Sequence, residues 1–469
     1  MSASITARRL ARELGDWRHG SAAYRALAER IRVLLLDGRL SSGMRLPAER
    51  ELCTALALSR TTVTAAYAQL RDEGYLSSVR GSGSTLALPG GHRGFAGGDL
   101  SLPLDFTKAT SPAYPGLAAA FGRAAERIPA HLSMDGFDMV GLPELRSSIA
   151  GHYEGRGLPT SPDQIMVTTG AQHALSLITH ALHSSGERVL VEHPTYPHAL
   201  DTFTAAGARI VTVPVAAGPG WNLPQAQLLL RRSAPSLAFV MPDFHNPTGL
   251  SMPEEARAAL ARMAQREGTT LIVDETTAWL DIDRGPRSPM AVHSSAIVTL
   301  GSLGKVAWGG LRIGWIRASR ELLDRVLQIR PGLDLGTPLL EQLVAVEVLA
   351  EARELQSSRS AQLRRGRDQL VDAVRSRFPQ WSLDVPDGGL ALWVNTGNLS
   401  TSALALAARA EGLALVPGPR FGTDGAFERF LRLPFGYPPE QLTAAVEVLA
   451  RVAPRAGTAP LKTPLQAVI

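Results

Sequence analysis

Short β-rich runs alternate with helix-length stretches between residues 164 and 302, and this alternation is the feature that most constrains the fold. Strands that alternate with helices predict a mostly parallel sheet with helices packed on its faces. Ligands bind such sheets at the carboxyl ends of the strands, so the loops after these runs are the first places to look for a site. The runs are QIMVTTG (164–170), RVLVEHP (188–194), ARIVTVPV (208–215), SLAFVMP (236–242), TTLIVDE (269–275) and AIVTLGS (296–302).

The length of the chain predicts more than one domain, because 469 residues exceed what one hydrophobic core usually organises. Residues 85–106 are rich in Gly and Pro and show no helical period, which is typical of a linker. From about residue 335 the pattern predicts a long helix and then two strands of a smaller C-terminal unit, LALWVN and FLRLPF. We therefore predict a first domain at 18–85, a linker at 86–106, a second domain at 107–452 and a flexible tail at 453–469.

Composition narrows the classes of protein. The chain has 45% hydrophobic and 19% charged residues, and no apolar run approaches the roughly 18 to 20 residues that span a bilayer, so we expect no membrane partner. A single cysteine, Cys53, and an N-terminus without an apolar segment before a cleavage site predict a cytoplasmic protein. No residue pattern indicates a metal site.

Charge is unevenly distributed along the chain. Residues 1–85 hold 13 Arg, no Lys and 8 Asp or Glu, a net charge of +5 that equals the net charge of the whole chain. This asymmetry indicates a polyanion as partner for the N-terminal end, although a mildly basic solvated surface would give the same count.

The N-terminal region reads as short helices followed by a hairpin. Apolar residues recur at helical spacing in 21–40, which predicts a helix. A second helix is predicted in PAERELCTALAL (47–58), because Pro is favoured at the first position of a helix and Glu in its first turn. Ser59 is a good N-cap for a further helix, whose stripe ends at Gly74. Two helices separated by about three residues predict a helix-turn-helix. The following YLSSVRGSGSTLAL predicts two strands joined at RGSGS, a wing.

Polar residues follow several of the β-rich runs. In TTGAQHAL a helix would begin near Gly170, and the backbone N–H groups of Gly170, Ala171 and Gln172 would then be free to bind a phosphate. Tyr196 in PTYPH could stack on a flat ligand, and Asn246 and Asp274 stand at strand ends. Taken singly, each has an ordinary explanation: a backbone glycine, a packed ring, a turn or a helix cap.

The stretch TLGSLGKVAWGGLRIGW (299–315) adds two cations to an otherwise apolar, glycine-rich segment, and cations are rarely buried without a partner. A lysine with a lowered pKa can supply the amine of a Schiff base. Pyridoxal phosphate needs such an amine, a carboxylate for its ring nitrogen, a donor for its phenolate oxygen and a cradle for its phosphate. One sequence meets all four needs, with Lys305, Asp274 and Asn246 for the first three and with Gly170, Ala171, Gln172, Ser302 and Arg312 for the cradle.

Residues 105–452 resemble the fold type I aminotransferases, because TTGAQ, PTY, NPTG, VDE, SLGK, GGLRIGW and FLRLPF follow one another in the order of that family. The resemblance implies that Lys305 forms the Schiff base with pyridoxal phosphate and that Asp274 pairs with the pyridine nitrogen. It further assigns Asn246 to the phenolate oxygen, Tyr196 to stacking on the ring, and Ser302 and Arg312 to the phosphate. Arg432 in FLRLPF matches the arginine that grips an α-carboxylate, for which a bidentate guanidinium is well suited.

The chain departs from the family at two places. The family usually has a tyrosine two or three residues after the aspartate, where this chain has Thr276 and Thr277, and Gly304 replaces a serine. A threonine is shorter than a tyrosine and lacks the acidity of a phenol. We therefore assign Thr277 to the cofactor site but expect inefficient proton transfer during transamination.

Residues 45–85 resemble the winged helix-turn-helix of the GntR regulators, because LPAER, SRTTV, EGYL and GSGS come in family order. The resemblance places the helix that follows Ser59 in the major groove of DNA. It implies that Arg50 and Arg60 contact phosphates or guanine edges, that Ser59, Thr61 and Thr64 contact backbone or bases, and that Arg80 and Gly81 lie in the wing. The alternative for Arg50 is a pairing with Glu49 or Glu51.

Together the two parts resemble the MocR regulators, a GntR-like head joined to an aminotransferase-like body. That resemblance implies a PLP-dependent transcriptional regulator, a head-to-tail homodimer, an operator of double-stranded DNA, and an amino compound or PLP itself as effector. Two alternatives stay open: a working aminotransferase that carries a DNA-binding head, and a cofactor-free body that serves only dimerisation. Thr276 and Thr277 lean against the first.

Overall fold

The protein is described from a computed structural model, which places residues 4–15, 17–18, 22–36, 39–40, 43–79, 83–87, 102–133, 135–216, 218 and 220–457. Most of the predicted linker, most of the tail and the wing residues Arg80 and Gly81 lie outside these ranges. The chain divides into two compact units. The first comprises Met1–Thr107, Asn395–Leu431 and Glu447–Ile469, and the second comprises Lys108–Val394 and Arg432–Val446.

The second unit is built on an eight-stranded sheet in the order β4-β11-β10-β9-β8-β5-β6-β7. Its pairs are parallel from β10 through β9, β8 and β5 to β6, whereas β11 runs antiparallel to both of its neighbours and β7 runs antiparallel to β6. The predicted α/β fold with a mostly parallel sheet is thus confirmed. The strands are β4 (Ile165–Thr168), β5 (Arg188–His193), β6 (Arg209–Ala216), β7 (Gly220–Trp221), β8 (Leu237–Val240), β9 (Thr270–Asp274), β10 (Val298–Ser302) and β11 (Gly314–Arg317).

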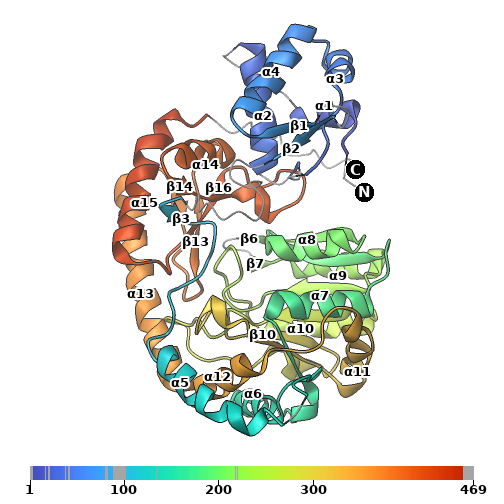
Figure 1. Ribbon diagram of the computed structural model, residues 1–469, viewed down its shortest axis with the longest axis vertical. Helices are drawn as coiled ribbons and strands as arrows, with labels where there is room; N and C mark the ends of the chain where they lie inside the picture. The colour runs from blue at the N-terminus through green and yellow to red at the C-terminus, as the bar shows by residue number, and fades with distance from the viewer. Residues whose placement is uncertain are drawn as a thin grey trace. The chain divides into compact units, whose positions relative to one another are not determined.

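Helices pack around the strands of this sheet (Figure 1). Strands β4, β8 and β10 are buried at every position, as expected for strands covered on both faces. Apolar side chains of α7, α8 and α11 join those of the strands in one core. The helices of the second unit are α5 (Leu117–Arg127), α6 (Pro143–Gly155), α7 (Ala171–Leu182), α8 (Pro197–Ala205), α9 (Leu223–Ser233), α10 (Glu254–Arg266), α11 (Arg320–Ile329), α12 (Leu339–Ala350) and α13 (Ala352–Arg377).

The single long helix predicted from about residue 335 is wrong in detail, because α12 and α13 are separate helices. The break falls at Glu351, whose backbone leaves helical geometry (φ −99°, ψ 22°) and whose carboxylate binds Arg123 at 2.7 Å. Neither glycine nor proline occurs at this position, so the local sequence does not predict the helix break, which is associated instead with a tertiary contact. Strands β12 (Ser382–Leu383), β13 (Ala391–Asn395), β16 (Phe430–Pro434) and β15 (Val416–Pro417) form a four-stranded sheet in that order, and α15 (Pro439–Val452) follows β16.

The first unit contains the N-terminal head, which has the predicted helix-turn-helix and hairpin (Figure 1). Helices α3 and α4 are joined by a short turn in which Ala57 is left-handed (φ 51°), and β1 pairs antiparallel with β2. The sequence analysis did not predict α1, which is buried against the head through Leu10 and Leu14. The head elements are α1 (Ala7–Leu14), α2 (Ala23–Leu36), α3 (Glu49–Leu56), α4 (Arg60–Asp72), β1 (Leu76–Val79) and β2 (Gly83–Leu86).

The rest of the first unit includes α14 (Thr401–Ala410) and a parallel pair of β3 (Leu104–Asp105) with β14 (Leu413–Ala414). Short 3₁₀ helices connect the larger elements of both units: η1 (Ile128–His131), η2 (Pro162–Gln164), η3 (Met290–His293), η4 (Gly309–Leu311), η5 (Arg330–Gly332), η6 (Gly418–Phe421) and η7 (Ala453–Arg455). Among the helices that the structure describes, none has the length and apolar character needed to cross a bilayer.

Candidate functional site

A cavity of about 210 Å³ opens in the second unit at the carboxyl ends of β8, β9 and β10. The residues assigned to the cofactor from the sequence meet here although they come from distant parts of the chain, and only Gly170 among them is absent from the wall. Met241, Phe244, His245 and Thr276 also line the cavity. The assigned residues in the wall are Ala171, Gln172, Tyr196, Asn246, Asp274, Thr277, Ser302, Lys305 and Arg312.

Lys305 presents its amine to this cavity from the loop after β10. Its Nζ donates a hydrogen bond to the backbone carbonyl of Ala109 at 3.2 Å. Burial, with a smaller contribution from the charge of Arg432, lowers the pKa of Lys305 to about 8, and the carboxylate of Asp274 opposes the shift. A larger fraction of this amine is therefore neutral near neutral pH than for an exposed lysine, and the neutral form is the nucleophile.

Asp274 is the last residue of β9, and its side chain is buried, with 7% of the residue exposed. Burial raises the pKa of Asp274, while hydrogen bonds from Thr276 and the charge of Lys305 act against this rise. The backbone N–H of Thr276 donates to Oδ1 at 2.9 Å and so fixes the orientation of the carboxyl group. A buried carboxylate held in this way suits a protonated ring nitrogen.

Another part of the cavity wall is suited to an anion. Helix α7 begins at Ala171, so its first backbone N–H groups lack partners within the helix and its dipole favours negative charge there. The guanidinium of Arg312 donates to the carbonyl of Thr169 at 2.9 Å. The hydroxyl of Ser302 donates to the carbonyl of Ile313 at 2.9 Å and accepts from the N–H of Gly304 at 3.0 Å.

Gly170 does not line the cavity, but its lack of a side chain leaves room for Arg312. Its backbone is in the left-handed region (φ 85°), and a Cβ at this position would lie 2.8 Å from Nη2 of Arg312. Gly170 therefore allows the guanidinium to lie against the N-terminus of α7.

Thr277 and Asn246 differ in the hydrogen bonds that their side chains make within the protein. The hydroxyl of Thr277 donates to the backbone carbonyl of Asp243 at 2.6 Å, so its proton is already committed to the protein. The side-chain amide of Asn246 lines the cavity without a hydrogen-bond partner among the residues that the structure describes. Asn246 rather than Thr277 is thus able to donate to a ligand oxygen.

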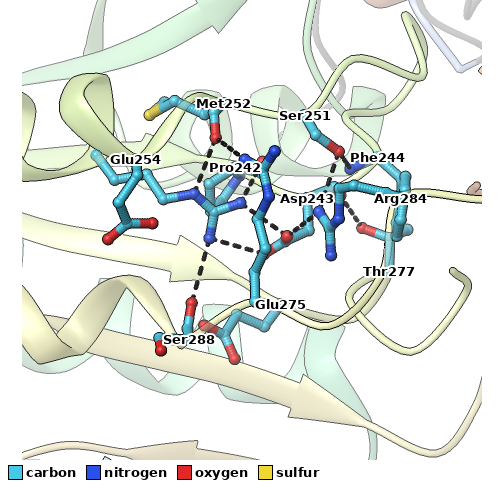
Figure 2. A network of polar contacts seen from close by, with 12 residues as sticks. Pro242, Asp243, Phe244, Ser251, Met252, Glu254, Glu275, Thr277, Arg284 and Ser288 are labelled. Atoms are coloured by element: carbon cyan, nitrogen blue, oxygen red, sulfur yellow. Dashed lines mark hydrogen bonds and ion pairs between the residues drawn. The ribbon is translucent and has the colours of Figure 1, made fainter. Parts of the chain in front are cut away.

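The sequence analysis missed a buried network around Asp243, which lies three residues before Asn246 and pairs with Arg284 (Figure 2). Asp243 and Arg257 are fully buried and joined at 2.7 Å, and Arg284 forms a second ion pair with the same carboxylate. Burial acts to raise the pKa of Asp243, but the two arginines hold it below its usual range. Arg284 also lies 4.3 Å above the ring of Phe244. The available signal was a carboxylate directly after a buried strand, in MPDF.

Arg432, assigned to an effector carboxylate, lies in β16 with 5% of its surface exposed. Burial lowers its pKa to about 10. Its charge lowers the pKa of both Lys305 and Tyr196, which places the guanidinium close to both, although it is not part of the cavity wall itself. Burial raises the pKa of Tyr196 to about 12, so the phenol stays protonated at neutral pH.

The residues assigned to DNA that the structure describes are exposed on the head. Ser59 caps α4 by accepting from the N–H of Thr62 at 3.1 Å, and Arg60 and Thr61 are exposed in the first turn of that helix. Thr64 is exposed but donates to Glu49 at 2.6 Å.

Arg50 is exposed and forms no ion pair with Glu49 or Glu51 in the described part of the chain, so the structure does not show the alternative of a local pairing. Arg80 and Gly81 fall outside the described residues. The described residues hold no cluster of three or more His, Cys, Asp or Glu side chains able to bind a metal ion.

Comparison with known proteins agrees with this division of the chain. Residues 123–449 match the family of class I and II aminotransferases. The chain belongs to this family. Residues 23–86 match the gntR family of bacterial regulatory proteins, so a GntR-type DNA-binding domain is fused to an aminotransferase-like domain.

Two regulators and one enzyme illustrate the similarity. The pyridoxine biosynthesis transcriptional regulator PdxR of Corynebacterium glutamicum is 30% identical over 78% of this chain and 81% of its own length. The probable rhizopine catabolism regulatory protein MocR of Rhizobium meliloti is 28% identical over 84% of this chain and 86% of its own. The crystal structure of the α-aminoadipate aminotransferase LysN from Thermus thermophilus superposes with a TM-score of 0.69 and 28% identity, covering 76% of this chain and 93% of LysN. The predicted MocR-type regulator is thus confirmed at the level of the family.

Proposed function

We propose that this protein is a cytoplasmic transcription regulator that binds operator DNA through its head, holds pyridoxal phosphate around Lys305, and responds to an amino compound or to the cofactor itself. The observation that carries the proposal is a lysine amine with a pKa lowered to about 8 that shares one cavity with a buried carboxylate and an anion-binding helix N-terminus. When bound, pyridoxal phosphate supplies an aldehyde that condenses with amines and a ring that withdraws electrons.

The donor set of the cavity fits this cofactor. Lys305 would present a neutral amine to the aldehyde, and Asp274 would hold a proton on the ring nitrogen. Asn246 would donate its amide N–H to the phenolate oxygen, and Tyr196 would stack on the ring. Arg312 and the N-terminus of α7 would bind the phosphate, and Ser302 would join them once its hydroxyl turns away from the carbonyl of Ile313.

Arg432 supports an effector with an α-carboxylate, because a buried guanidinium near Lys305 is a fixed cation with a bidentate donor face. An effector changes DNA occupancy only to the extent that it binds one conformation of the protein better than another. The switch therefore requires that cofactor or effector occupancy alter the affinity of the head for DNA.

A working aminotransferase is the second candidate, favoured by the presence of Lys305, Asp274 and Arg432 in one site and by the likeness to LysN. Against fast turnover stands Thr277, whose proton is committed to Asp243. Keto acid released over many turnovers with an amino acid donor would favour this candidate over a sensor.

The first experiment uses the fact that the chain has only three lysines, Lys108, Lys305 and Lys462. The full chain is incubated with pyridoxal phosphate, reduced with borohydride to fix the condensed aldehyde, and mapped by peptide mass. We expect the label on Lys305, its loss in Lys305→Ala and its retention in Lys108→Ala. Operator binding is then measured with and without pyridoxal phosphate, and dependence on cofactor that survives Lys305→Ala would contradict the proposal.

Exposed apolar side chains support the proposed homodimer. Phe137 and Leu335 are 66% and 57% exposed and flank the bridge between Asp138 and Gly336, so they lie side by side. Leu132 and Leu333, from the same two segments, are also exposed. Exposed apolar patches mark association surfaces. Sedimentation velocity should show a dimer that Phe137→Glu dissociates, whereas Leu228→Glu, at an exposed leucine of α9, should leave it intact.

A further inference from the structure

Helix α1 precedes the residues that match the gntR family, yet it is an integral part of the head. Ile5, Leu10 and Leu14 are buried in the core of the head. Arg30 donates to the carbonyl of Leu14 at 2.9 Å, and Arg39 pairs with Glu13 at 2.5 Å. These contacts hold α1 in one orientation, so its exposed face has a defined direction.

That exposed face is basic and borders a groove. Arg8 and Arg12, one helical turn apart on α1, line the groove together with Arg45 and Arg50. Only one carboxylate, that of Glu51, lies in the same wall. Within the described part of the chain, neither Arg8 nor Arg12 has a hydrogen bond or an ion pair made by its side chain.

The chemistry of the groove favours a duplex backbone over a small ligand. The groove carries four guanidinium groups but no aromatic side chain on which a base or ring could stack. The groove extends to Arg50, which lies in the first turn of α3. A row of cations along an open groove matches a row of phosphates, and such contacts bind independently of sequence.

We infer that Arg8 and Arg12 of α1 bind phosphates of double-stranded DNA beside the segment that α4 reads. This inference rests on the proposed function, because it requires that the head bind DNA. It adds to that function a second contact surface outside the winged helix-turn-helix, which lengthens the footprint and raises affinity without changing base preference.

The test compares full-length variants for binding to a labelled random-sequence duplex of about 40 base pairs by fluorescence anisotropy, from about 50 to about 200 mM salt. Each lost phosphate contact lowers the slope of log K against log salt by about 0.9. We therefore expect Arg8→Gln/Arg12→Gln to lower the slope by about 1.8 per head and to weaken binding about tenfold at the lowest salt. Arg8→Lys/Arg12→Lys should retain most of the slope.

Arg9→Gln is the matched control, because Arg9 is exposed on the same helix but does not line the groove. Thermal melting should be equal for all of these variants. The inference is overturned if the Arg8/Arg12 double variant keeps the affinity and slope of the wild type, or if Arg9→Gln lowers the slope equally.

Arg60→Ala separates this inference from the proposed function. If Arg60→Ala weakens duplex binding and the double variant does not, the head binds DNA without α1, and only the inference fails. If the wild-type chain does not bind duplex DNA at all, both fail.

Discussion

The hydroxyl of Thr277 donates a hydrogen bond of 2.6 Å to the backbone carbonyl of Asp243, the residue whose carboxylate pairs with Arg257 and Arg284. This single contact joins the loop after β9 to the turn after β8. At the position where the resemblance to the aminotransferases predicts a tyrosine, this chain thus has a threonine that joins two loops of the cavity.

Thr277→Val tests this tie. The substitution keeps the shape but removes the donor, and it leaves a buried carbonyl without its partner, so we expect a loss of about 1–2 kcal/mol in the free energy of unfolding. Denaturant unfolding measures this loss. Thr204→Val, at an exposed threonine of α8, serves as control and should change stability by less than about 0.5 kcal/mol. Equal stability of the two variants would contradict the structural role of Thr277.

The pKa of Lys305 predicts the pH dependence of cofactor binding. The folded-state pKa is lowered to about 8, so the neutral amine accumulates as pH rises toward that value. The rate of condensation with pyridoxal phosphate should rise about tenfold for each pH unit below 8 and level off above it. Stopped-flow absorbance measures this rate. Because the charge of Arg432 lowers this pKa, Arg432→Gln should move the profile to higher pH, and an unmoved profile would show that the two groups do not interact.

Gly170→Ala should damage the anion-binding end of the cavity. The new Cβ would lie 2.8 Å from Arg312 Nη2 and would force a left-handed backbone on alanine, so the guanidinium must move. We expect a loss of about 1–2 kcal/mol in stability and at least about tenfold weaker binding of pyridoxal phosphate. Equilibrium titration measures the affinity. Gly151→Ala is the control, because a Cβ in that turn of α6 meets nothing within 4 Å and should be neutral or stabilising.

Arg359 of α13 should prove essential to the loop that carries Lys305. Its buried guanidinium donates to the carbonyls of Val306 at 2.7 Å, Ala307 at 3.0 Å and Pro112 at 2.8 Å, and burial lowers its pKa to about 10. Arg359→Met removes these three hydrogen bonds, and only the carbonyl of Ala307 keeps another donor, the backbone N–H of Tyr114 at 2.9 Å, among the described contacts. We therefore expect a loss of about 3 kcal/mol or more together with weaker cofactor binding.

Arg353→Met, at an exposed arginine of the same helix, provides the comparison for Arg359→Met. Unfolding curves and pyridoxal phosphate titrations are recorded for both variants. If Arg359→Met binds the cofactor as tightly as Arg353→Met does, Arg359 contributes to stability alone and does not position Lys305.

The amino-acid sequence by itself determined the α/β class, the helix-turn-helix with its hairpin, and a group of polar residues that meet in the wall of one cavity. These features are readable because local periodicity, helix caps and short motifs are properties of neighbouring residues. Asp274, for example, ends an apolar run, and Lys305 stands between glycine-rich stretches, so each has a signal within its own segment.

Only the tertiary structure decided which side chains are committed to the protein and which remain available to a ligand. Thr64 pairs with Glu49, Thr277 with Asp243, and Arg359 with the loop after Lys305, and each of these contacts joins segments separated by many residues. Likewise, α1 became part of the head through Leu10 and Leu14 in a shared core and through contacts with Arg30 and Arg39. Such contacts depend on how helices and strands cross in space, and no local pattern encodes that geometry.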